Sequence, residues 1–387
     1  MRYVDGLPAF GAYVHVPFCR RRCGYCAFAT WSDRHHLWEQ YVKACRSEVK
    51  RLADQGVGPV SSVYFGGGTP SLLPAEMLLG VLDDLAESAG LAPAAEVTVE
   101  CNPDTVTPEL LRSYRAGGVT RLSFGVQSMV PHVLASLGRE HGPASVERAA
   151  QWAGEAGFAG SYSVDLIFGA AGETLADWEA SIVGVLALGP PPAHVSAYAL
   201  SVEPGTPLAR RPELYPDDDD QARKYALADA LLGEAGFQWY EISNWCKPGA
   251  ECAHNLLYWS QGEYVGIGCS AHSHRVLDDG GARRWWNVAT PELYCERAET
   301  GRPAEAAGET LGSAEREWEA LMLGLRTRAG VPASALPADV HEQGLVELHR
   351  RPVAGSAVGE QRAVLTLRGR LLANEVSLML QTPLRAQ

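Results

Sequence analysis

The segment AYVHVPFCRRRCGYCAF, residues 12–28, is the stretch that decides the fold, because a short apolar run leads directly into three closely spaced cysteines. The run 12–17 has the alternating, β-branched and aromatic content of a buried strand. Cys19, Cys23 and Cys26 follow it in a C-x3-C-x2-C spacing. Iron–sulfur clusters are held by cysteine thiolates, normally four for a [4Fe–4S] cluster. Three thiolates in one loop can hold three irons and leave the fourth iron open to a small chelating ligand.

Two other interpretations of this loop stay open at the level of the residues. A zinc site would need a fourth ligand, for which His15 or a distant cysteine is a candidate, and the loop could also be purely structural. The other six cysteines show no metal-ligand spacing, and we predict that they fill the core: Cys45, Cys101, Cys246, Cys252, Cys269 and Cys295.

Length and composition narrow the class of protein. The chain has 387 residues, 46% of them hydrophobic, and a net charge of −13. Such an acidic chain does not suit nucleic acid as its main partner, because a phosphate backbone requires a basic surface. We find no apolar run long enough to span a membrane and no secretory signal. The sequence therefore predicts a cytoplasmic protein with reduced cysteines, and it says nothing of the oligomeric state.

Up to about residue 240, strand-like runs alternate with helical patterns. Six strand-then-helix units are expected, whose strands are 12–17, 62–68, 96–102, 121–127, 162–169 and 194–200. Parallel strands need such helical crossovers, and unusual residues stand at the end of each of these strands. Because active sites in α/β barrels gather at the carboxyl ends of the strands, we predict an α/β fold with a partial (β/α)6 barrel over residues 1–240.

The last third of the chain differs in pattern. Residues 241–312 are rich in aromatics and glycine, and we interpret them as an extension of the barrel. Residues 313–387 show the pattern of a helix, a further helix around 333–343, two short strands (345–350 and 363–368) and a last helix, which predicts an α+β winged-helix-like domain. The acidic run Asp217–Asp220 is expected to begin a helix, because negative charge complements the helix dipole there.

The cysteine loop, with the aromatic Tyr25 before its last cysteine, resembles the radical S-adenosylmethionine (SAM) superfamily, and so does Gly66-Gly67-Gly68-Thr69-Pro70 after the second strand. Several further motifs narrow the resemblance to the branch that holds oxygen-independent coproporphyrinogen III oxidase and the HemW heme chaperones: Y-x-H-x-P-F-C at 13–19, E-x-N-P at 100–103, SFGVQS, LGREH and VDLIFG. This resemblance covers nearly the whole chain.

The resemblance implies a [4Fe–4S] cluster on the three cysteines, and SAM bound to that cluster in contact with Tyr13, Gly67 and Glu100. It also implies a second SAM site, whose residues would be Tyr25, Gly68, Thr69, Gln127, Arg139, Asp165 and Ala199. A carboxylate can accept hydrogen bonds from ribose hydroxyls, and an arginine can pair with a carboxylate. Simpler structural roles stay open: Asn102-Pro103 is also a good turn sequence, and Asp165 could cap the loop after its strand.

Two features separate the chain from the oxidase and favour the chaperone. The oxidase has a further cysteine where this chain has Phe28, and it has a longer segment before the cluster loop than the 18 residues found here. HNLLYW, 254–259, resembles the H-N-x-x-Y-W motif of the HemW proteins. That resemblance implies His254 as a heme iron ligand and Asn255, Tyr258 and Trp259 as the heme region. Without it, the better interpretation of the motif would be a loop held by hydrogen bonds of His254 and Asn255, with Tyr258 and Trp259 packed in the core.

The sequence therefore predicts a radical SAM-type protein that binds heme and passes it to heme-requiring, for example respiratory, proteins, some of which lie at membranes. The alternative is an enzyme that decarboxylates the propionates of coproporphyrinogen in heme biosynthesis. A SAM-dependent enzyme with another substrate is a third hypothesis.

Overall fold

The computed structural model describes residues 10–53, 57–353 and 356–380. Its centre is a run of six parallel strands in chain order: β1 (Phe10–Val16), β2 (Val60–Gly67), β3 (Leu91–Cys101), β4 (Arg121–Gln127), β5 (Tyr162–Phe168) and β6 (His194–Ala199). Each predicted strand is present, although β3 begins five residues earlier than the alternating pattern indicated. The predicted α/β fold is confirmed.

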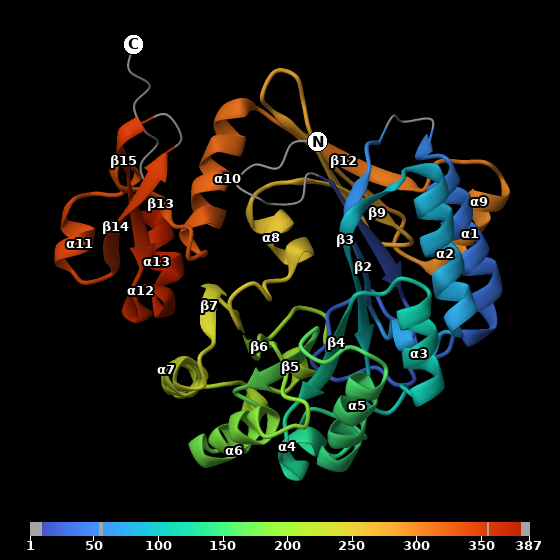
Figure 1. Ribbon diagram of the computed structural model, residues 1–387, viewed down its shortest axis with the longest axis horizontal. Helices are drawn as coiled ribbons and strands as arrows, with labels where there is room; N and C mark the ends of the chain where they lie inside the picture. The colour runs from blue at the N-terminus through green and yellow to red at the C-terminus, as the bar shows by residue number, and fades with distance from the viewer. Residues whose placement is uncertain (1–9, 54–56, 354–355, 381–387) are drawn as a thin grey trace.

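Helices cover the outer face of these strands (Figure 1). They are α1 (Trp38–Lys50), α2 (Ala75–Ser88), α3 (Pro108–Ala116), α4 (Pro131–Ser136), α5 (Pro143–Glu155), α6 (Leu175–Leu186) and α7 (Asp218–Glu234). The side chain of Asp217 caps α7 by accepting a hydrogen bond from the Asp220 N–H at 2.8 Å, so the acidic run begins a helix as predicted. The six remaining cysteines are buried, as expected for core residues.

The sheet continues beyond the six parallel strands at both edges. On one side β8 (Asn244–Cys246) pairs antiparallel with β6 and with β7 (Gln238–Glu241). On the other, β9 (Glu263–Ile267) pairs parallel with β1, followed by the antiparallel strands β10 (His272–Val276), β11 (Ala282–Asn287) and β12 (Glu305–Leu311). Across the described residues the result is one twelve-stranded sheet with two open ends, from β12 to β7. An extension was predicted here, but its strands were not.

Two short helices complete the extension. α9 (Pro291–Glu299) lies beside α1, on the outer side of the sheet (Figure 1). α8 (Ala253–Trp259), which carries the HNLLYW motif, lies on the inner side against β1 and β2. Gly11 permits this approach, because a Cβ at that position would lie 2.9 Å from the Leu257 side chain and 3.1 Å from the His254 ring.

The C-terminal part contains α10 (Ser313–Leu325), β13 (Val331–Pro332), α11 (Asp339–Glu342), β14 (Val346–Val353), β15 (Ser356–Leu365), α12 (Leu367–Leu371) and α13 (Ala373–Leu378), with a three-stranded sheet in the order β13-β15-β14. Helices flanking short antiparallel strands agree with the predicted pattern, and the winged-helix-like domain itself stays a prediction. The predicted helix 333–343 is split into a 3-10 turn and α11, because the residue before Pro337 disfavours helical backbone.

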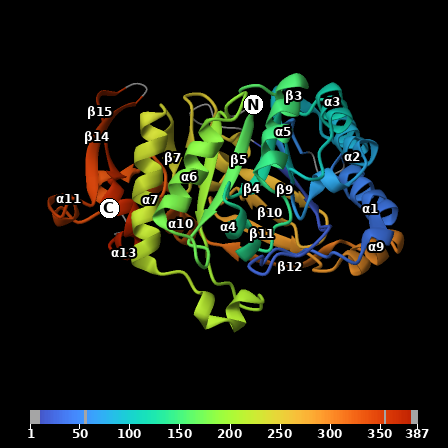
Figure 2. The same cartoon turned by 90° about the horizontal axis from the view of Figure 1, so that it is seen from below.

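An ion pair joins this part to α7, which covers the parallel strands. Arg370 on α12 donates to both carboxylate oxygens of Asp229 on α7, at 2.8 and 2.7 Å, and Figure 2 shows α7 beside the C-terminal elements. None of the helices in the described ranges is long and apolar enough to cross a membrane.

Candidate functional site

The three predicted cluster cysteines lie in the loop that follows β1, at the carboxyl end of the parallel strands. Cys19, Cys23 and Cys26 are each partly exposed. The loop is tied back by the Cys19 N–H, which donates to the Trp31 carbonyl at 3.0 Å, and by the Cys26 N–H, which donates to the Cys23 carbonyl at 3.2 Å. These backbone hydrogen bonds thus hold the thiols at the carboxyl end of the parallel strands.

The surroundings of the thiols fit an iron–sulfur cluster. The Thr69 hydroxyl lies 3.7 Å from the Cys19 sulfur, and an Arg139 guanidinium nitrogen lies 3.8 Å from the Cys23 sulfur. Both are donors that suit a charged thiolate. Burial raises the pKa of the Cys19 and Cys26 thiols, so metal binding would have to supply the charge that makes them thiolates.

Zinc is the poorer fit. Among the residues that the structure describes, no three histidine, cysteine, aspartate or glutamate side chains converge on a point where one ion could bind. A [4Fe–4S] cluster takes one thiolate per iron and does not need such convergence.

The glycine-rich segment at the end of β2 lies beside β1 and donates a hydrogen bond to the Glu100 carboxylate. Gly67 has φ +109°, and its N–H donates to Glu100 Oε2 at 3.0 Å. A Cβ on Gly67 would collide with the His15 ring, and one on Gly68 would lie 2.7 Å from the Phe18 carbonyl oxygen. Glycine is therefore required here by the packing of the protein itself, in addition to any close approach of a ligand.

Two carboxylates face a cavity of about 310 Å³ on the inner side of the sheet. Glu100, at the end of β3, accepts a hydrogen bond from the Tyr64 hydroxyl at 2.9 Å. Asp165 on β5 accepts from the Ser123 hydroxyl, at 3.0 Å to the nearer oxygen. Burial, and secondly the charge of Asp165, raises the pKa of Glu100 to about 7, and burial raises the pKa of Asp165. Buried acceptors of this kind suit a ligand with several hydroxyl or amino groups.

The structure places the other predicted SAM residues around the same strand ends. Tyr13 also lines the cavity, and its hydroxyl lies 3.1 Å from His15 Nδ1. Arg139 donates to the Gly125 carbonyl at 2.8 Å. Gln127 has φ +66°, a strained conformation for a residue with a side chain, and such strain is concentrated at functional sites.

Tyr25 packs with Leu137, Ile167 and Leu200, away from the 310 Å³ cavity, and Ala199 is the exposed last residue of β6. Their predicted contacts with SAM stay predictions.

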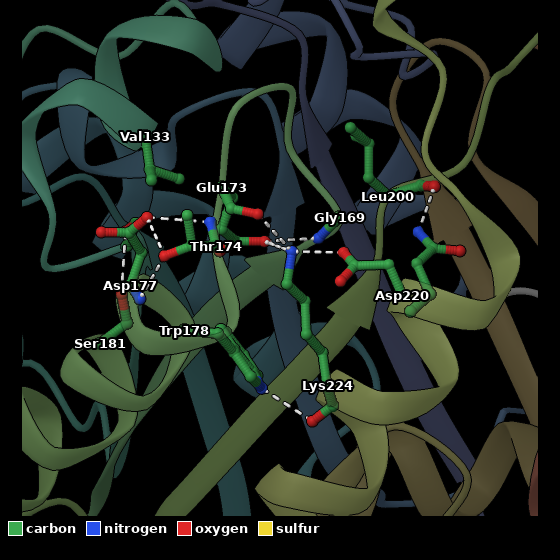
Figure 3. A network of polar contacts seen from close by, with 12 residues as sticks. Val133, Gly169, Glu173, Thr174, Asp177, Trp178, Ser181, Leu200, Asp220 and Lys224 are labelled. Atoms are coloured by element: carbon green, nitrogen blue, oxygen red, sulfur yellow. Dashed lines mark hydrogen bonds and ion pairs between the residues drawn. The ribbon is translucent and has the colours of Figure 1, made fainter.

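A buried ion pair fixes the loops that follow β5 and β6 (Figure 3). Lys224 is completely buried, and its ammonium lies 3.0 Å from Glu173 Oε2 and 2.6 Å from Asp220 Oδ2. The same Glu173 oxygen accepts from the Gly169 N–H at 2.7 Å, while Gln221 donates to the Leu200 carbonyl at 3.0 Å. These contacts hold the two strand ends where ligand residues are expected. Lysine side chains are rarely buried in proteins. The sequence therefore offered no indication that Lys224, which lies in a charged run, would form a buried ion pair.

His254 is buried on the inner side of the sheet. Its side chain is 1% exposed, and both ring nitrogens have partners: Nδ1 lies 3.0 Å from the Ser62 hydroxyl and Nε2 lies 2.8 Å from the Tyr258 hydroxyl. Its ring also stacks on that of Tyr64, with 5.4 Å between centroids. Burial lowers the pKa of His254 to about 3, so the imidazole is neutral at physiological pH. Binding of iron to Nε2 would require the Tyr258 hydroxyl to leave.

The other polar side chains of the HNLLYW motif differ in their hydrogen bonding. Asn255 donates to the Tyr240 hydroxyl at 3.1 Å and to Glu241 at 3.2 Å. The Trp259 indole N–H is buried and has no hydrogen-bond partner among the residues that the structure describes. Tyr258 lines the 310 Å³ cavity and also a second cavity, and the two cavities share Tyr13 and Phe28 in their linings as well.

Comparison with known proteins gives consistent matches. The family model described as "Radical SAM superfamily" matches residues 13–182. The heme chaperone HemW of Mycobacterium tuberculosis is 42% identical over 382 residues, which cover 95% of this chain and 93% of that protein. The chain belongs to the HemW family. Escherichia coli HemW is 36% identical over 292 residues, covering 75% of this chain and 76% of the relative.

A solved structure, that of E. coli coproporphyrinogen III oxidase (HemN), matches with a TM-score of 0.80 and 22% identity, covering 96% of this chain and 90% of the other. At that identity the likeness concerns the fold alone. The fold and family predicted from the sequence are therefore confirmed. Tyr64 donates a hydrogen bond to Glu100 and stacks on the His254 ring, but the sequence did not identify it as a site residue. Its two partners lie 36 and 190 positions away along the chain.

Proposed function

We propose that this chain binds heme and delivers it to heme-requiring proteins. The observation that carries the proposal is the 42% identity to a protein named heme chaperone HemW, extending over 95% of the chain. The site supports it through its aromatic lining, in which Tyr13, Phe28 and Tyr258 border both cavities beside the cysteine loop. Rigid aromatic surface of this kind suits a flat, largely apolar macrocycle. We also propose that the chain acts in the cytoplasm, where it passes heme to acceptor proteins. Membrane-bound acceptors would be reached by peripheral contact.

The [4Fe–4S] cluster would be held by Cys19, Cys23 and Cys26, and together with SAM it would supply the redox chemistry that characterises this superfamily. Tyr13, Gly67 and Glu100 are the residues proposed to hold that SAM. Residues proposed for a second SAM are Tyr25, Gly68, Thr69, Gln127, Arg139, Asp165 and Ala199. Within this set, the Thr69 hydroxyl also donates toward the Cys19 sulfur, and the Arg139 guanidinium donates toward the Cys23 sulfur. These contacts would link the cluster to the bound SAM.

Phe28 argues against the decarboxylase. Its side chain is 66% exposed and lies between the two cavities, two positions after Cys26, so the position offers apolar surface and no thiol. The sequence-based prediction that His254 ligates the heme iron, with Asn255, Tyr258 and Trp259 around it, requires the His254–Tyr258 hydrogen bond to break. Replacement of His254 by alanine tests that prediction.

One sample can separate carrier from enzyme. Protein with a reconstituted cluster would be titrated anaerobically with ferric heme and, in parallel, incubated with coproporphyrinogen III, SAM and a strong reductant. The proposal predicts stoichiometric heme binding, seen as a shifted Soret band, and no vinyl-bearing product. Decarboxylation without retained heme would assign the oxidase activity instead, and the absence of both would favour a SAM-dependent enzyme with another substrate.

A further inference from the structure

The second, larger cavity lies on the other side of Tyr13, between the cysteine loop and the strands β9 to β11. Its volume is about 560 Å³, within the range of small-molecule and cofactor sites. Ala27, Phe28 and Ala29 border it from the cysteine loop, and Glu319 and Leu323 border it from α10. It is thus built from three parts of the chain that are far apart in sequence, and the cluster loop forms one wall.

The floor of this cavity is an aromatic and imidazole surface. Side chains alternate between the two faces of a strand, so His272 and His274 on β10 point to the same side. Their cross-strand neighbours are Trp286, which pairs with His272, and Tyr264, which pairs with His274. The rings of His272 and Trp286 stack at 5.6 Å and 28°, and those of Tyr264 and His274 at 6.0 Å and 26°. Stacked rings of this kind suit a flat ligand.

The two histidines differ in availability. His274 is buried, and its Nδ1 is bonded to the Gly262 carbonyl at 2.9 Å. His272 is exposed to the cavity, and within the described residues no hydrogen bond or ion pair engages either of its ring nitrogens. Desolvation, with the nearby Arg284 charge, lowers the pKa of His272, which keeps the ring in the neutral form that can ligate a metal.

The charges around the cavity argue for one class of ligand. Arg284 is paired at 2.9 Å with Glu309 and at 3.1 Å with Glu319, so a ligand held here by its anionic groups alone would have to displace one of these carboxylates. A bare divalent cation also lacks a site, because the described residues contain no group of three converging metal-ligating side chains. A metalloporphyrin brings four ligands of its own and needs one imidazole from the protein. The largely exposed Phe28 ring would be covered by such a macrocycle.

We propose that this cavity receives the heme, with His272 as the iron ligand and Phe28 and Tyr264 as the surrounding aromatic surface, while Trp286 supports the His272 ring by stacking on it. The inference rests on the proposed function and adds a site to it. His254 then acts as a positioning residue, because its hydrogen bond to the Tyr258 hydroxyl fixes a side chain shared by both cavities. Heme placed here would lie beside the cysteine loop, which forms the opposite wall.

The test compares ferric heme with metal-free protoporphyrin IX on the full-length, cluster-loaded protein. The variants are His272→Ala, His254→Ala and a matched control, His349→Ala, an exposed histidine on β14. We expect His272→Ala to weaken heme binding by at least about tenfold and to abolish the shift of the Soret band that imidazole ligation produces, because a direct metal ligand is lost. Metal-free porphyrin, which makes no iron bond, should bind this variant and the wild type alike. Free imidazole should restore that Soret shift.

The outcomes separate the two claims. Heme binding by His272→Ala with wild-type affinity and spectrum would overturn the inference while leaving a heme chaperone intact. Loss of the Soret shift in His254→Ala alone would also overturn the inference, because the iron ligand would then be His254. A wild-type protein that binds neither heme nor metal-free porphyrin would overturn the proposed function itself. Retention of the iron–sulfur absorbance in every variant shows that the chain is still folded, and the surface position of His272 favours that result.

Discussion

Replacing Glu100 by Gln should stabilise the folded chain at alkaline pH while weakening SAM binding. The carboxyl group ionises near pH 4.5 in the unfolded chain, and burial beside Asp165 raises its pKa to about 7 in the folded protein. Below the lower value both states hold the proton, and above the higher value neither does. The stability that Glu100 contributes is thus lost as the pH rises between these values.

The size of the effect follows from the shift. Each pKa unit corresponds to about 1.4 kcal/mol, so the ionised carboxylate destabilises the fold by at most about 3 kcal/mol above neutral pH. This is an upper limit, because water can enter the cavity that Glu100 lines, and because the Gln amide must find an acceptor. Gln keeps the side-chain shape and cannot ionise, but its single amide oxygen can accept only one of the two hydrogen bonds that Tyr64 and Gly67 donate to separate carboxylate oxygens.

The measurement is the free energy of unfolding in urea for the metal-free wild type and Glu100→Gln, at about pH 5 and about pH 8. The difference between the two proteins should grow in favour of the variant by about 1–3 kcal/mol toward the higher pH. Calorimetry on cluster-loaded protein should show weaker SAM binding by the same variant. A stability difference that does not change with pH would refute the assigned ionisation, and unchanged SAM affinity would remove Glu100 from the ligand site.

Three further changes probe separate parts of the molecule. Cys23→Ala should lose the [4Fe–4S] absorbance and its iron, whereas Cys45→Ala, which removes a buried thiol on α1, should keep both. Gly67→Ala should reduce SAM affinity and also lower the thermal midpoint, because the added methyl collides with the His15 imidazole. Lys224→Met leaves Glu173 buried without its partner and should cost about 3–5 kcal/mol of stability in urea unfolding. A Lys224→Met, Glu173→Gln double variant should recover part of that loss, and no recovery would count against the pairing.

The parallel core could be predicted from the sequence because its signals are local. Apolar runs of strand length alternate with helical periods, and the Gly66–Gly68 run or Glu100 stands where a strand ends, so each motif could be placed from its own neighbourhood. The acidic run before α7 was predictable for the same reason, since a capping side chain acts within three residues.

The remaining features depend on partners that are distant in sequence. β9 pairs with β1 across some 250 positions, and no local pattern in either strand names the other. His254 could be identified as part of a motif, but its ring nitrogens are bonded to Ser62 and Tyr258, and only the folded chain shows that neither is free. His272 lies in a short strand of no unusual composition, and its exposure follows from the cavity around it.

Heme transfer to an acceptor is the property that separates a heme carrier from a protein that merely binds heme. Heme-loaded, cluster-containing protein would be mixed with a heme-free b-type acceptor, and the acceptor's Soret band would be followed against an equal amount of free heme. We expect the acceptor to fill stoichiometrically and faster from the carrier than from free heme, while the carrier's own heme spectrum is lost at the same rate. Heme that stays on the carrier, or an acceptor that fills no faster than with free heme, would contradict a role in delivery.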